Sequence, residues 1–159
     1  MPFSLRPLAD SDRPWLRQFL REHWGEEIMV DRGRVYRPAE QTGFLAEAEG
    51  AVVGVILYQI ASGQCEIMVL ESLRPEQGIG VALMNAVFDA ARGYHCRRVW
   101  LITTNDNIQA LKFYQKRGLR LIAVYPNAVD EARLLKPSIP LVAENGVPIR
   151  DELELELIL

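Results

Sequence analysis

The chain has 159 residues and a mass of 18.0 kDa, which is long enough to bury a substantial hydrophobic core in one domain. Its hydrophobic content of 49% and charged content of 25% are those of an ordinary globular protein. The formal net charge of −3 argues against nucleic-acid binding, for which a basic surface is expected. The N-terminal segment has no long apolar run, so we expect neither a signal peptide nor a membrane span.

The first half of the chain predicts a strand, a helix and then a group of strands. Alternation over residues 3–8 favours a short strand, and apolar residues at helical spacing favour a helix from about residue 10 to residue 24. Residues 25–43 show no clear period and are expected to be irregular. Three strands follow between residues 44 and 73, with turns at Glu49-Gly50 and Ser62-Gly63.

The second half of the chain alternates strands and helices. In chain order we predict a helix over 78–93, a strand over 96–104, a helix over 106–118, a strand over 119–126, a short helix with turns over 127–150 and a last strand over 151–159. Early antiparallel strands followed by two strand–helix units predict a mixed α+β sheet with helices on both faces. We expect the whole of residues 1–159 to form one domain.

The last strand, "DELELELIL", alternates strictly between glutamate and leucine. The alternation places Leu153, Leu155 and Leu157 on one face and the glutamates on the other. If this strand lies at or near an edge of the sheet, it can pair across a two-fold axis, so a homodimer is predicted.

The two cysteines, Cys65 and Cys96, lie far apart and have no metal-ligand pattern beside them. We expect buried, reduced thiols, no bound metal and a cytoplasmic protein.

The segment "EQGIGVALM" places Gly78-Ile79-Gly80 between a strand and a helix. Free N–H groups at a helix start bind phosphate, and glycine lets the backbone approach the ligand closely. Leu83 stands where a dinucleotide-binding G-x-G-x-x-G would have its third glycine, and no Gly-Lys-Ser/Thr is present. A Rossmann-type nucleotide module is therefore disfavoured, and a pyrophosphate is the expected ligand of the turn.

A second motif, "NIQALKFYQKRGL" at residues 107–119, has the form N-x-x-A-x-x-F-Y-x-x-x-G-L. Together with "EQGIGVALM" it resembles the GNAT superfamily of N-acetyltransferases, which use acetyl-CoA. If Gly78 and Gly80 take the family's G-x-G places, Pro75 stands at its leading Gln/Arg position. Matching Gln77, Gly80 and Ala82 instead meets the consensus literally, and we prefer the first alignment because the G-I-G turn faces phosphate.

This resemblance implies a three-layer sandwich around a mostly antiparallel sheet of about seven strands, two of which are parallel and splay apart at the centre. It implies that acetyl-CoA binds along the strand ending at Leu73, at the glycine turn and on the second-motif helix. The implied cofactor-binding residues are Val69, Leu70, Leu73, Gln77, Gly78, Ile79, Gly80, Val81, Ala82, Asn107, Ala110 and Phe113.

The resemblance also implies the chemistry, which is direct transfer of an acetyl group to a primary amine in a ternary complex. Tyr114 of the second motif is expected to protonate the CoA thiolate, and an N–H group of Val69 or Leu70 to stabilise the thioester oxyanion. Glu66, a charge within the apolar strand "CEIMVL", is expected to be the base, with Glu71 as the alternative.

The acceptor amine is left open by the sequence, between a small molecule and a peptide. Two irregular regions should frame it, and both carry cations and aromatic residues outside any amphipathic pattern. The expected acceptor residues are Trp24, Arg32, Arg34, Tyr36 and Arg133, with Lys136 beside them. A non-catalytic acyl-CoA sensor or interaction module of the same fold remains the alternative function.

Overall fold

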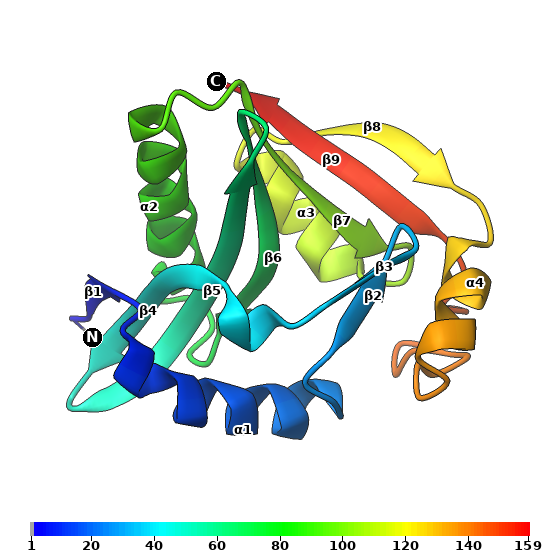
Figure 1. Cartoon of the computed structure of the whole chain (residues 1–159), viewed down its shortest axis with the longest axis horizontal. Coiled ribbons are helices and arrows are strands. Elements are labelled where there is room, and N and C mark those ends of the chain that lie inside the picture. The colour runs from blue at the N-terminus through cyan, green and yellow to red at the C-terminus, as the bar shows by residue number, and fades with distance from the viewer. Residues whose placement is uncertain (1) are drawn as a thin grey trace.

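The computed structural model describes residues 2–159 (Figure 1). In chain order its strands and helices are β1 (Ser4–Pro7), α1 (Arg13–Trp24), β2 (Met29–Asp31), β3 (Arg34–Tyr36), β4 (Thr42–Ala48), β5 (Ala51–Ala61), β6 (Gln64–Ser72), α2 (Ile79–Gly93), β7 (Arg98–Thr104), α3 (Ile108–Lys116), β8 (Arg120–Tyr125), α4 (Ala128–Leu135) and β9 (Glu152–Ile158). Short 3₁₀ turns at Asp10–Asp12 and Pro38–Glu40 complete the described elements.

Seven strands form one sheet in the order β1-β4-β5-β6-β7-β9-β8, and β2 and β3 form a separate hairpin. Every neighbouring pair in the large sheet is antiparallel except β6 and β7. Helix α1 and the β2–β3 hairpin lie on one side of this sheet, and α2 and α3 lie on the other (Figure 1). The predicted mixed α+β fold, with a central parallel pair in a mostly antiparallel sheet, is confirmed.

The two hairpins of the early strands turn where the sequence predicts. Glu49 and Gly50 have φ values of 54° and 76°, and Ser62 and Gly63 have φ values of 54° and 71°. Two consecutive residues with positive φ form the type of two-residue turn that matches the right-handed twist of paired strands. These turns fix the register of β4, β5 and β6, on which the rest of the sheet is built.

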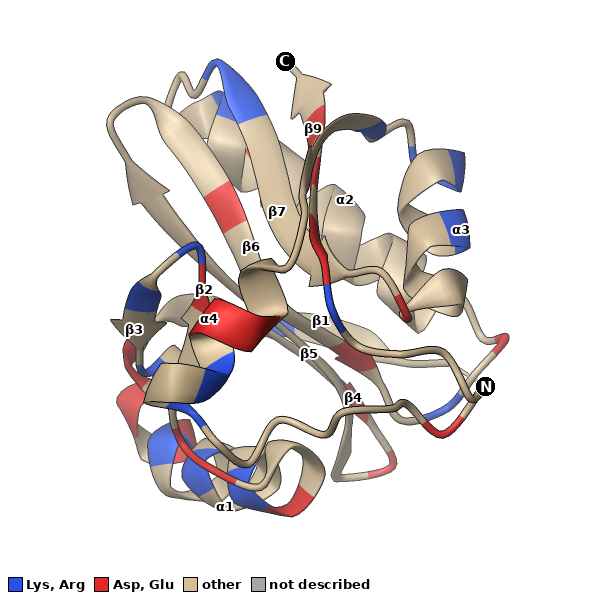
Figure 2. Ribbon diagram, turned by 90° about the vertical axis from the view of Figure 1, so that its right-hand side faces the viewer, with Lys and Arg blue, Asp and Glu red and all other residues tan. Residues whose placement is uncertain are grey.

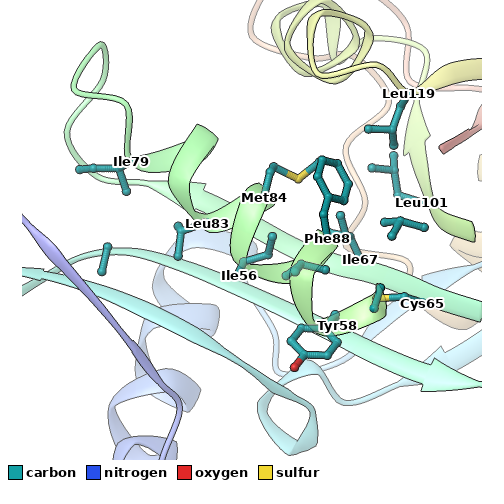
Figure 3. Close-up of a cluster of buried hydrophobic side chains, with 14 of the residues drawn as sticks. Ile56, Tyr58, Cys65, Ile67, Ile79, Leu83, Met84, Phe88, Leu101 and Leu119 are labelled. Carbon is teal, nitrogen blue, oxygen red and sulfur yellow. The ribbon is translucent and has the colours of Figure 1, made fainter. Parts of the chain in front are cut away.

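The sheet carries a separate apolar core on each face. The α2-side core joins the buried face of α2 to the inward side chains of the central strands, as Figure 3 shows for Met84, Phe88, Ile56, Ile67 and Leu101. Both cysteines lie in this core as free, buried thiols. The α1-side core consists of Leu16, Phe19, Leu20, Met29, Ala39, Leu45, Val55, Leu57 and Val69.

Helix α2 begins directly against the sheet because β5 has no side chain at Gly54. A Cβ atom at Gly54 would lie 2.5 Å from Cγ2 of Ile79 and 3.1 Å from Cδ1 of Leu83. Both contacts are with the first turns of α2, so Gly54 sets how closely the N-terminus of this helix approaches β5 and β6.

Two expectations are corrected by the strand order. Residues 25–43, expected to be irregular, contain the β2–β3 hairpin, whose strands of three residues each are too short to produce a readable alternation. The last strand, β9, lies between β7 and β8 and is not an edge strand, because both of its sides are paired. The edge on this side is β8, so the reason given for a homodimer does not hold.

None of the helices within residues 2–159 is both long and apolar enough to cross a membrane.

We predict that Gly54→Ala lowers the free energy of unfolding by about 1–3 kcal/mol, because the new methyl group overpacks the contact between β5 and α2. Urea denaturation measures this change. Gly93→Ala is the matched control, since a Cβ atom there has no heavy atom within 4 Å and Gly93 does not have a positive φ. Equal stabilities of the two variants would contradict the assigned packing.

Candidate active site

The two parallel strands of the sheet pair over only three residues and then separate. The pairs are Gln64 with Arg98, Cys65 with Val99 and Glu66 with Trp100, although β6 continues to Ser72 and β7 to Thr104. A bulge in β6 lies just beyond the last pair, because Tyr58 and Leu57 of β5 pair with Ile67 and Val69 and skip Met68. A bulge bends its strand and increases its twist, which turns β6 away from β7.

The bulge also changes which face each side chain of β6 occupies. Cys65 and Ile67 pack in the α2-side core, and strict alternation would place Val69 there as well. Instead, Val69 lies in the α1-side core and Leu70 packs on the α2 side.

The backbone of β6 beyond the bulge has unpaired groups facing the gap. The backbone N–H of Leu73 donates to the carbonyl of Val53 at 2.8 Å, so this N–H faces β5 and not the gap. In an antiparallel pair, hydrogen-bonded and non-hydrogen-bonded positions alternate. Leu70 and Ser72, which pair with Ile56 and Gly54, therefore turn their N–H and C=O groups toward the gap.

The glycine turn gives α2 a set of free N–H groups at its start. Gly78 is the N-cap, with φ of 77°, and no side chain caps the helix. Ala82 donates its N–H to the carbonyl of Gly78 at 3.0 Å, so this N–H, expected to face a ligand, is already used. Within residues 2–159, no hydrogen bond uses the N–H groups of residues 78–81.

Gly80 has a packing role in addition to its place in the turn. A Cβ atom there would lie 3.2 Å from Cζ of Phe113, so α2 and α3 touch at this point. Phe113 meets Tyr114 edge to face, with ring centroids 5.7 Å apart. The two sequence motifs are thus in direct contact, with half-buried Ala110 one turn earlier on α3.

Tyr114 packs against the α2-side core. Burial, together with a smaller effect of the nearby carboxylate of Glu71, raises the pKa of its phenol to about 12. The pKa of Glu71 is itself raised by burial, while His23 lowers it. Tyr114 therefore stays protonated at neutral pH and can donate its proton.

A cavity of about 530 Å³, which we call the splay cavity, lies on the α1 side of the gap. It is lined by the end of α1, by β2, by the bulge residue Met68, by the end of β7, by α4 with the segment that follows it, and by the start of β9. Asn107 also lines it, and its Nδ2 donates to Oγ1 of Thr103 at 3.2 Å instead of capping α3.

Glu66 lies outside the lining of this cavity and is bound to Arg34 through both carboxylate oxygens, at 2.9 and 2.6 Å. Arg34 also donates to Asp31 at 2.6 Å and lies over the ring of Trp100. Glu66 belongs to β6 and is only 5% exposed, whereas Arg34 belongs to β3. This ion pair therefore fastens the β2–β3 hairpin onto the sheet.

The other expected acceptor residues divide into two groups. Trp24 and Tyr36 line the splay cavity, and the hydroxyl of Tyr36 donates to Asp31 at 3.0 Å. Arg32 stacks on Tyr125, with the guanidinium carbon 3.4 Å from the ring centroid. Arg133 donates to the carbonyls of Ile139, Pro140 and Ile149 and to Asp130, so it holds the segment after α4 in place.

The cavity also contains a carboxylate that was not among the residues expected in the site. Glu152, only 2% exposed, accepts the backbone N–H of Arg32 at Oε1, at 3.0 Å. Within residues 2–159, its Oε2 has no hydrogen bond. Burial raises its pKa. The sequence could not distinguish Glu152 from Glu154 and Glu156, because only the pairing of Thr104 with Glu152 places it at the open end of β7.

Lys136, the C-cap of α4, also lines the cavity and is 7% exposed. Its Nζ donates to the carbonyl of Ile28 at 3.0 Å, and burial lowers its pKa. No group of three or more His, Cys, Asp and Glu side chains suited to a metal ion occurs in the described part of the chain.

Comparison with known proteins identifies the family of the chain. The family model described as Acetyltransferase (GNAT) family matches residues 6–119. The uncharacterised protein YdhI of Bacillus subtilis (strain 168) is 49% identical over 139 residues, which cover 87% of each chain.

Two solved structures share the fold. An IAA acetyltransferase from Bacillus cereus ATCC 14579 aligns with a TM-score of 0.75 and 20% identity, covering 99% of this chain and 100% of the other. A GNAT family acetyltransferase from Elizabethkingia anophelis, crystallised with acetyl-CoA bound, aligns with a TM-score of 0.69 and 19% identity, covering 99% and 98%. The chain belongs to the GNAT family of acetyltransferases.

Proposed function

We propose that this protein transfers an acetyl group from acetyl-CoA to a primary amine, directly and within a ternary complex. The observation that carries the proposal is the row of free N–H groups at residues 78–81, which begins α2 at the end of the gap between β6 and β7. The structural relative with acetyl-CoA bound supports the same cosubstrate. The buried, free cysteines are consistent with a cytoplasmic enzyme.

The chain offers acetyl-CoA two kinds of backbone contact. The N–H groups of residues 78–81 point out of a helix start, where unpaired donors and the helix dipole favour a pyrophosphate. Leu73 and Gln77 precede this turn, and the row of free donors ends at Val81, because the N–H of Ala82 is bonded to Gly78. Leu70 and Ser72 present the edge of β6 to the amides of the pantetheine arm. Asn107, Ala110 and Phe113 border the arm from the side of α3.

When bound, acetyl-CoA supplies an activated thioester. The amine nitrogen bonds to the carbonyl carbon, the carbon–sulfur bond breaks, and the sulfur takes the proton of Tyr114. The amine loses a proton to a base, which resupplies Tyr114 through solvent. Of the two donors considered for the oxyanion, Leu70 fits better than Val69, because the N–H of Leu70 faces the gap.

We assign the base to Glu152 in preference to Glu66. Arg34 binds both oxygens of Glu66, and Glu66 does not line the cavity. Glu152 lines the cavity, and within residues 2–159 one of its oxygens has no hydrogen-bond partner. Burial raises its pKa, which makes its carboxylate a stronger base.

Tyr114→Phe is expected to lower kcat by about 10²-fold or more, because it removes the proton donor and little else. Release of free thiol from acetyl-CoA, in the presence of an accepted amine, measures the rate. The KM for acetyl-CoA should change little, since the ring is kept. Tyr94→Phe is the control, because Tyr94 is 71% exposed at the end of α2.

A Tyr114→Phe enzyme as fast as the wild type would remove Tyr114 from the chemistry. Tight binding of acetyl-CoA by a wild-type protein that acetylates no amine would instead favour the non-catalytic acyl-CoA sensor.

The base assignment predicts different behaviour for two glutamine substitutions. Glu152→Gln should lower kcat by about 10²-fold and remove the acidic limb of the pH profile of kcat/KM, with little change in stability. Glu66→Gln should lower the free energy of unfolding by about 1–3 kcal/mol and reduce kcat less than Glu152→Gln does. If Glu66→Gln instead had the lower kcat, and only this variant lost the acidic limb, Glu66 would be the base.

A further inference from the structure

We infer that the acetyl acceptor is a small molecule that carries a carboxylate besides its amine, and that Lys136 binds this carboxylate in the splay cavity. The inference rests on the proposed acetyl transfer and names the substrate class of that site.

Lys136 differs from the other buried charged side chains of the described chain. The buried carboxylates of Glu66 and Glu154 form ion pairs with Arg34 and Arg98, at 2.6 and 2.9 Å. Glu152 lies 3.9 Å from the guanidinium of Arg32. Lys136 is as buried as these groups, yet it forms no ion pair within residues 2–159. A buried ammonium without a counter-charge is unfavourable, so its presence in a cavity wall calls for an anionic ligand.

The ammonium of Lys136 also has donors to spare. It can make three hydrogen bonds, and the structure uses one of them, to the carbonyl of Ile28. Ser138, two residues further on, turns its hydroxyl to Glu26 and does not bind the lysine. The carboxylate of Glu26 raises the pKa of Lys136, but burial lowers it by more, so the pKa of the lysine stays lowered.

The lining of the same cavity also carries the negative charge that such a substrate needs. Glu152 of β9 and Asp31 of β2 line it, and within residues 2–159 Oε2 of Glu152 has no hydrogen bond. Apolar side chains line the cavity as well, among them Trp24, Met29 and Ile139. A cavity lined by an ammonium and by carboxylates complements a zwitterion whose amine binds Glu152 and whose carboxylate binds Lys136.

The size of the cavity and its charges decide against other acceptors. About 530 Å³ is within the range of small-molecule sites. A diamine or polyamine would bring a second cation against Lys136, and a simple alkylamine would leave the lysine without a counter-charge.

The test compares amino acids with their own amides, in which the charge of the carboxylate is removed and the shape is kept. The panel contains glycine, β-alanine, 4-aminobutyrate, 6-aminohexanoate and phenylalanine, each beside its amide, with thiol release from acetyl-CoA as the rate. We expect at least one acid to have a KM lower than that of its amide by about 10- to 100-fold. The amine of an amino amide is less basic than that of the acid, so a larger fraction of it is the neutral nucleophile. This difference favours the amide and therefore works against the expected preference for the acid.

Lys136→Met should remove the preference for the acid, and Lys136→Arg should keep part of it. Lys116→Met is the matched control, because Lys116 is exposed at the end of α3. Lys136→Met should also melt no lower than the wild type, since the lowered pKa of Lys136 means that its buried charge opposes folding. If Lys136 served only the fold, Lys136→Met would be less stable than the wild type. Its ratio of the KM for the amide to the KM for the acid would then be unchanged.

The inference is overturned if no acid of the panel exceeds its amide in turnover or in calorimetric binding to the CoA-saturated protein. It is also overturned if the preference survives in Lys136→Met. Failure of the proposed function is seen separately, because a wild-type protein that does not bind acetyl-CoA fails before any amine is added.

Discussion

The separation of β6 from β7 after three paired residues is the constraint on which the rest of this structure depends. It follows from the single extra residue Met68, which bends β6 at the point where the parallel pairing stops. Within residues 2–159, the bend leaves the outward N–H and C=O groups of Leu70 and Ser72 without a partner strand, and Met68 lines a cavity on the α1 side. The gap and the exposed backbone edge of β6 are therefore consequences of one local irregularity between well-paired strands.

The face of β6, β7 and β9 opposite the α2-side core is polar and yet largely buried. Arg34 joins Glu66 to the β2–β3 hairpin, and Arg98 binds Glu154 at 2.9 Å and Glu156 at 2.8 Å. Acidic positions alternate along β9 (Figure 2), and the first of them, Glu152, accepts the backbone N–H of Arg32 at the turn of the β2–β3 hairpin. Such pairs give little net stability but strongly penalise the loss of one partner, so they fix where the hairpin lies. The hairpin in turn closes one side of the splay cavity.

The periodic parts of the fold could be predicted from the sequence, because apolar spacing and turn glycines report local structure directly. The strands around Glu49-Gly50 and Ser62-Gly63, helix α2 and the alternation of β9 were all predictable on this basis. The β2–β3 hairpin was missed because three-residue strands carry no period. The sequence could not show that β9 enters the sheet beside β7, and this pairing alone singles out Glu152 among three equivalent glutamates. Likewise, nothing local shows that Glu66 meets Arg34, 32 residues earlier. The roles of these glutamates depend on contacts between residues far apart in the sequence, which its periodicity does not show.

The central claim is that the gap beyond the bulge and the free start of α2 hold acetyl-CoA. Calorimetric titration of the purified protein with acetyl-CoA tests it most directly, with CoA and NADH as comparison ligands. The account predicts micromolar binding of acetyl-CoA and CoA and no measurable binding of NADH, which lacks the pantetheine arm that pairs with β6. A folded protein with an empty site that binds neither acetyl-CoA nor CoA, or that binds NADH equally well, would contradict it.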